Sequence, residues 1–291
     1  MPKRTFKFLL YAIHGHLADG LPDYSKLAER IIGFKGRYWR DGSRVVAFGA
    51  AMLTRGKSSV DRASLIAYSG EVDKSVLFFD LEQQSEINSL LESGRFVARK
   101  TRIMFDPRQR ILMIEAGRGH LPAEEFAKIV ETELQNQAGF EALELSFTPV
   151  AAPTFISQID EMKRIQSVMV SIARPNYGWT DRYDQFNKFA DESDAKSIDA
   201  TVRARRNSSL SKQNGIVPNL KHWLSKGLPS VINAKVRGAF GEGSGLIELK
   251  LSDHVETANI TTDVKPDSGQ PLDSEIQEKL STYLDQRAES V

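Results

Sequence analysis

Residues 95–118 carry a dense group of cations. Seven Lys and Arg side chains in this segment are accompanied by only two acids, Asp106 and Glu115: Arg95, Arg99, Lys100, Arg102, Arg108, Arg110 and Arg118. A guanidinium group holds a phosphate with two parallel hydrogen bonds, which a Lys ammonium does not. We therefore expect this segment to contact the phosphate backbone of a nucleic acid. The alternative is an exposed hairpin whose charges protect it from aggregation.

Two further segments support a polyanionic partner. Arg37 and Arg40 flank two aromatic residues, a composition typical of surfaces where bases stack and phosphates are neutralised. Residues 196–226 contain a single acid, Asp199, among many cations. The cations of this segment that we expect to bind are Arg203, Arg205, Arg206 and Lys212. We expect the partner to be DNA rather than RNA.

Catalytic and metal-binding patterns are weaker. His14 and His16 would share one face of a strand, as a metal pair or as a general base would require. Glu248 and Lys250 would also share a strand face, as in metal-dependent nucleases. Neither pair has an identifiable third group, so we expect no metal and no cofactor, and a binding protein rather than an enzyme. A metal-dependent or histidine-dependent nuclease remains the alternative.

The composition is that of a folded globular chain, with 41% hydrophobic and 26% charged residues. The chain has no cysteine, which excludes disulfides and thiolate metal sites and favours a reducing compartment. The apolar run Phe8–Ile13 is too short for a signal peptide, and no apolar window spans a membrane. We therefore expect a cytoplasmic location without membrane attachment.

Charge is distributed unevenly along the chain. Residues 1–118 hold 20 Lys and Arg against 13 Asp and Glu, whereas residues 119–291 hold 19 against 25. This asymmetry indicates either a basic surface that meets a polyanion or two halves that meet each other. A protein-interaction subunit, with a basic first half docked on an acidic partner, is a further alternative.

Hydrophobic periodicity predicts an α+β fold, with antiparallel sheets flanked by helices. The clearest pattern is a hairpin over 95–105 and 110–116, whose turn begins at Asp106 and Pro107. The other elements expected in the first half are strands at 5–14, 44–53, 63–68, 75–81 and 143–148, and helices from Pro22, over 82–91 and from Pro122 to Leu134.

The second half of the sequence predicts a second mixed set of elements. We expect helices at 154–162, near 220–224 and from Ile276 to Leu284, strands at 165–173, 231–237 and 246–251, a polar helical region at 181–206 and a loop at 252–274. We place a domain boundary near Ala151, which gives domains of 1–150 and 151–291. One continuous domain is an equal alternative.

Several segments together resemble phage-exclusion and defence proteins of the RexA and KwaB type. These segments are KFLLYAI, RFVARKTRIMF, DPRQ, ILMIEAGRG and AEEFAKIVE. The resemblance implies a non-catalytic, homodimeric protein that binds duplex DNA with little sequence preference, in a phage-defence or mobile-element system. Our leading hypothesis is accordingly a nucleic-acid-binding protein.

Overall fold

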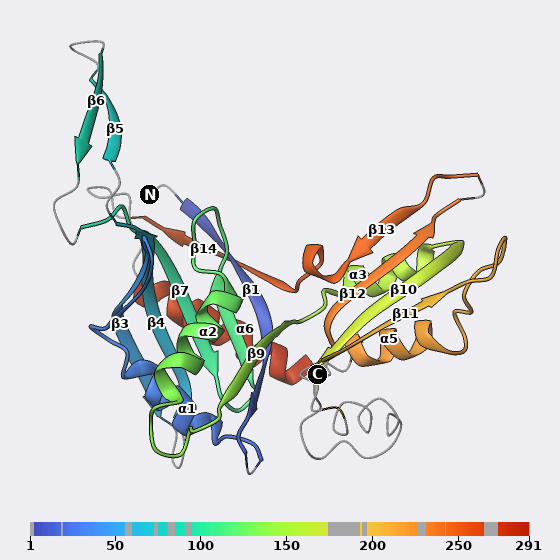
Figure 1. Cartoon of the computed structure of the whole chain (residues 1–291), viewed down its shortest axis with the longest axis horizontal. Helices are drawn as coiled ribbons and strands as arrows, with labels where there is room; N and C mark the ends of the chain where they lie inside the picture. Colours follow the sequence, from blue (N-terminus) through green and yellow to red (C-terminus); the bar gives the residue numbers. More distant parts are fainter. Residues whose placement is uncertain are drawn as a thin grey trace.

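The computed structural model describes residues 3–18, 20–55, 60–72, 75–80, 85–90, 95–173, 193, 197–225, 231–241, 243–264 and 273–290. Two sheets with their helices form two lobes that lie side by side (Figure 1). All strand pairs among the described residues are antiparallel, and together with the helices this confirms the predicted α+β class. None of the described helices is both long and apolar enough to cross a membrane.

The first sheet contains eight strands in the order β14-β1-β8-β7-β4-β3-β2, and β9 pairs with the second half of β1. Side chains alternate between its two faces, and both faces are buried over the central strands of the sheet. Its strands are β1 (Lys3–His16), β2 (Tyr38–Asp41), β3 (Arg44–Arg55), β4 (Val60–Glu71), β7 (Arg99–Asp106), β8 (Ile111–Glu115), β9 (Glu144–Pro149) and β14 (Thr257–Asp263).

Three helices cover the two faces of the first sheet. Helices α1 (Tyr24–Ile32) and α2 (Ala123–Leu134) enclose one core with sheet residues such as Phe48 and Phe147. Helix α6 (Asp273–Ser290) covers the opposite face and buries Phe8 in a second core. The protein therefore buries its central strands, including β7 and β8, on both sides.

The second sheet contains four strands in the order β11-β10-β12-β13. Helices α3 (Pro153–Glu161) and α5 (Ile216–Ser225) cover one face, where Phe155 and Trp223 pack on Val168. The strands are β10 (Arg164–Ala173), β11 (Ser197–Arg203), β12 (Val231–Ala239) and β13 (Ile247–Lys250), and the short 3-10 helix η1 (Leu251–Asp253) follows them.

Three predicted elements differ from the structure. The helix expected at 82–91 is strand β6 (Ser85–Leu90), which pairs with β5 (Ser75–Asp80), since hairpin pairing overrides a weak helical pattern rich in Ser and Asn. The loop expected at 252–274 contains η1 and β14, because β1 offers β14 a partner. In the polar region expected to be helical, residues 197–203 form β11, while residues 181–192 and 194–196 lie outside the described part.

The chain crosses between the lobes twice. It leaves the first sheet after β9, near the predicted boundary at Ala151, and returns at β14. The two crossings pair with each other: Ala152 N–H donates to the His254 carbonyl at 2.8 Å, and Glu256 N–H donates to the Val150 carbonyl at 2.7 Å. Elements β14 and α6, which belong to the predicted second domain, therefore lie on the first sheet.

Candidate nucleic-acid interface

The predicted basic hairpin forms, but one of its cations is buried and paired with carboxylates of the protein itself. Arg102 is only 5% exposed. Its Nη1 donates to Glu115 Oε2 at 2.8 Å, its Nε donates to Asp273 Oδ1 at 2.8 Å, and its guanidinium lies over the Phe6 ring. Arg102 projects on the same side of β7 as Met104, which packs with α6, whereas Ile103 between them faces the core with α1 and α2. Because Arg102 is buried and its charge is paired there, the structure contradicts its predicted contact with phosphate.

The other hairpin cations are dispersed. Lys100 Nζ donates to Asp273 Oδ2 at 2.6 Å, and Arg108 pairs with Asp61 at 3.2 Å. Arg110 lies over the ring of Tyr24. Arg95, Arg99 and Arg118 are exposed near the opposite end of β7. The seven cations therefore do not gather on one surface of the hairpin, and the predicted contacts of Arg95, Arg99 and Arg118 stay a prediction.

The Arg37 and Arg40 group lies on a different edge. Strand β2 is the outer strand of the first sheet, and Arg37 pairs with Glu133 at 3.6 Å. Arg40 Nε donates to the Gly42 carbonyl at 2.9 Å. The neighbouring Tyr38 is 71% exposed, so the group is accessible but lies far in the strand order from β7.

The second sheet brings together cations from three strands. Directly paired residues of an antiparallel sheet project on the same side. Val168, Val236 and Leu249 project together into the core with α3 and α5. The opposite face therefore carries the alternate residues. Three rows cross it: Arg203-Ser167-Arg237-Glu248, Thr201-Met169-Lys235-Lys250 and Asp199-Ser171-Asn233.

We call this surface the basic face, defined by Arg203, Lys235, Arg237 and Lys250. All four side chains are at least partly exposed. In the described part of the chain, Glu248 is the carboxylate that forms an ion pair with this set, to Lys250 at 3.8 Å. Two more exposed cations, Arg205 and Arg206, follow β11 directly.

Sequence reasoning found only part of the basic face. Of its four cations, only Arg203 was predicted to bind; Lys250 was considered only in a catalytic pair with Glu248, and Lys235 and Arg237 were missed. In the sequence of β12 these two cations flank the apolar Val236, and this alternation could have placed both on the face opposite the core. The sequence does not show which residues of β10, β11 and β13 lie beside them, because the register of the sheet decides that. The predicted Lys212 lies elsewhere, because its Nζ donates to the Asp160 carbonyl at the end of α3.

The two pairs considered as alternatives, His14 with His16 and Glu248 with Lys250, lie in separate parts of the structure. His14 is buried, and its Nε2 lies 3.0 Å from Thr148 Oγ1. Burial, with smaller contributions from His16 and Arg110, lowers the pKa of His14 to about 3, so it stays neutral. Among the described residues, no three His, Asp or Glu side chains gather as metal ligands, and this includes Glu248.

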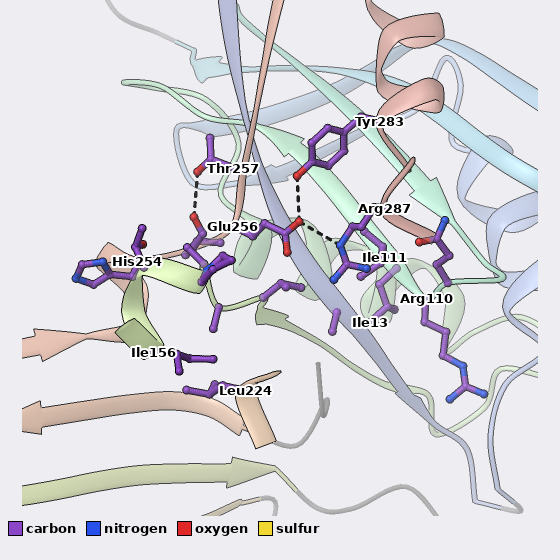
Figure 2. Close-up of a pocket in the computed structure, with 18 of the residues that line it drawn as sticks. Ile13, Arg110, Ile111, Ile156, Leu224, His254, Glu256, Thr257, Tyr283 and Arg287 are labelled. Atoms are coloured by element: carbon purple, nitrogen blue, oxygen red, sulfur yellow. Dashed lines mark hydrogen bonds and ion pairs between the residues drawn. The ribbon is translucent and has the colours of Figure 1, made fainter. Parts of the chain in front are cut away.

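Two cavities flank the crossing segments. One, of about 910 Å³, lies on the α6 side (Figure 2). There the Tyr283 hydroxyl and Arg287 Nε donate to Glu256 Oε1 at 3.0 and 3.1 Å. Burial, followed by the nearby Glu256, raises the pKa of Tyr283 to about 12. These polar groups hydrogen-bond to one another and hold α6 against the segment that returns from the second sheet.

The second cavity, of about 840 Å³, lies on the α2 side. His120 Nε2 is 3.6 Å from Glu115 Oε1, and this interaction raises the pKa of His120 above its ordinary value. Glu115 also accepts from the side chain and backbone of Arg102. The pair thus belongs to the network that holds the hairpin.

Comparison with protein families places part of the chain in a family whose function is not described. Residues 77–226, just over half of the chain, match the family described as "Domain of unknown function (DUF4747)". No curated protein matches the chain significantly. The matched region contains β10, β11 and the cations of the 203–206 segment.

Proposed function

The chain belongs to the DUF4747 family, and we propose that it binds nucleic acid through the basic face of its second sheet. The observation that carries the proposal is the convergence of Arg203, Lys235, Arg237 and Lys250 on a sheet face that the described helices leave uncovered. Neighbouring strands are about 4.8 Å apart and same-face residues about 6.6 Å apart, so the cations form a compact grid. Such a grid neutralises several consecutive phosphates.

The uncharged residues of the same face indicate how the ligand is held. Ser167, Ser171, Thr201 and Asn233 offer hydrogen bonds to phosphate and sugar oxygens, and Met169 lies in the middle. The rows of this face contain no aromatic side chain among the described residues, so base stacking has no platform there. We therefore propose largely sequence-independent contacts with the backbone.

Duplex DNA is the ligand to test first. The resemblance to phage-exclusion proteins implies this ligand, and the role in phage defence and the cytoplasmic location remain predictions from the sequence. The nuclease alternative has less support, because His14 is buried and neutral and because Glu248 belongs to no group of three or more potential metal ligands among the described residues.

The experiment compares two triple variants that remove equal charge. Arg203→Ala/Lys235→Ala/Arg237→Ala removes three of the four cations that define the basic face. Lys26→Ala/Arg30→Ala/Lys35→Ala removes three exposed cations around α1 as a matched control. Binding of a labelled duplex is measured by fluorescence anisotropy over a range of salt concentrations.

We expect the basic-face variant to bind on the order of 100-fold more weakly at low salt. Its log–log salt dependence becomes shallower by roughly 0.9 for each phosphate that the protein no longer neutralises. The control variant keeps the wild-type slope. Equal weakening in the two variants would mean that binding follows net charge and not this face, and a wild-type protein that does not bind would overturn the proposal.

A further inference from the structure

Strand β13 forms an outer edge of the second sheet. It pairs with β12 on one side, and no described strand pairs with its other side (Figure 1). An edge strand presents unpaired N–H and C=O groups that another strand can bind. Ile247 and the preceding Leu246, at the start of this edge, are 40% and 38% exposed and form a small apolar surface beside the unpaired strand edge.

The charges on β13 alternate in sign along one face. Glu248 and Lys250 both project on the basic face, and Leu249 between them projects into the core. If a second copy of β13 is placed antiparallel about a two-fold axis at Leu249, Glu248 lies opposite the partner's Lys250. The same axis places Lys250 opposite the partner's Glu248. Directly opposed unlike charges stabilise a strand pair, whereas like charges destabilise it.

We propose that two copies of the chain associate through their β13 strands and form one continuous eight-stranded sheet. The apolar side of the new pair is also complementary, because Leu249 lies opposite the partner's Leu249, and Ile247 lies diagonal to it. Edge strands that evade pairing carry charges that repel a second copy. On β13, by contrast, the order Glu248 then Lys250 places unlike charges opposite each other when a second copy pairs antiparallel.

The association has a consequence for the basic face. Both copies of Arg203, Lys235, Arg237 and Lys250 then lie on the same side of one sheet, so the cationic grid doubles in length. This consequence rests on the proposed function, whereas the association itself does not.

The first test exchanges the charges and measures mass without nucleic acid by analytical ultracentrifugation. The wild type is expected at twice the 32.5 kDa of one chain. Glu248→Lys alone opposes Lys to Lys at both positions, and Lys250→Glu alone opposes Glu to Glu. Each single variant is expected to dissociate at least about tenfold more readily. Circular dichroism checks that each variant is folded.

Two rescues make the test specific. An equimolar mixture of the two single variants opposes unlike charges again and is expected to form a heterodimer. The variant that carries both substitutions restores the pairing within a homodimer. A wild-type monomer, or single variants whose association is unchanged, would overturn the proposal.

Cross-linking tests the register directly, since the chain has no cysteine of its own. A mixture of Glu248→Cys and Lys250→Cys chains places the two thiols directly opposite each other, at Cα separations of about 4.5–5.5 Å, which allow a disulfide. Each variant alone places its thiols on the diagonal, about 7–8 Å apart, and cross-links poorly. Efficient cross-linking of either variant alone would contradict the register. Because neither test contains DNA, failure here is distinct from failure of the proposed binding.

Discussion

Arg102 and Asp273 are 171 residues apart in the chain, and Arg102 Nε donates to Asp273 Oδ1 at 2.8 Å. This contact joins strand β7 to the first turn of α6. Arg102 also holds Glu115 on the neighbouring strand. The cation is thus a structural residue, and its charge is neutralised inside the protein.

Replacing Arg102 is expected to destabilise the fold strongly. Arg102→Met leaves Glu115 buried without its main partner, at a cost of about 3–5 kcal/mol of unfolding free energy. Urea denaturation followed by circular dichroism measures the loss. Arg118→Ala, which removes an exposed cation, should change stability by no more than about 0.5 kcal/mol and is the control. A double variant, Arg102→Met/Glu115→Met, should recover part of the loss, and an Arg102→Met protein as stable as wild type would contradict the role.

His14 is expected to make the protein sensitive to acid. Its pKa is lowered to about 3 in the fold, from 6.5 when unfolded, so the unfolded state binds the proton more readily. Stability from this group is complete above pH 6.5 and declines as the pH falls from 6.5 towards 3, by roughly 4–5 kcal/mol in total. His14→Gln, which does not titrate, should flatten the decline in unfolding free energy over this interval. A wild-type profile in the variant would show that other groups control acid unfolding.

His120 is expected to act in the opposite direction. Its pKa is raised by Glu115, so the folded state holds the proton more tightly. The stabilisation is complete below pH 6.5 and disappears as the pH rises through the higher folded pKa. NMR titration of the His120 ring should give a pKa above 6.5 in the wild type. In Glu115→Gln the value should fall, and an unchanged value would exclude Glu115 as the cause.

The sequence predicts local features of this fold better than it predicts contacts between distant segments. The hairpin of β7 and β8 follows from its turn at Asp106 and Pro107, because Asp106 Oδ1 accepts from two backbone N–H groups of the same turn. The burial of Arg102 depends on α6, which no local pattern places against β7. Strand β14 was missed for the same reason, since its partner β1 lies at the other end of the chain.

The candidate site illustrates the same limit. Local composition identified Arg203 as part of a basic segment. Lys235 and Arg237 are isolated cations in the sequence of a strand, and only the register of β10 with β11 and β12 places them in rows beside Arg203. Charge density along the sequence therefore favoured the hairpin over the basic face.

Leu280 tests how much of the stability depends on α6. It is 1% exposed and packs with Phe8 against the first sheet. Leu280→Ala leaves a cavity in this core and is expected to lower the unfolding free energy by about 2–5 kcal/mol. Thr282→Ala is the control on the same helix, because Thr282 is exposed and its hydroxyl donates to the carbonyl of Glu278 in the preceding turn. Thermal and urea unfolding of both variants measure the difference. Equal stability of the two would mean that α6 contributes little to the core, and that its ion pairs with Lys100 and Arg102 hold it in place without apolar support.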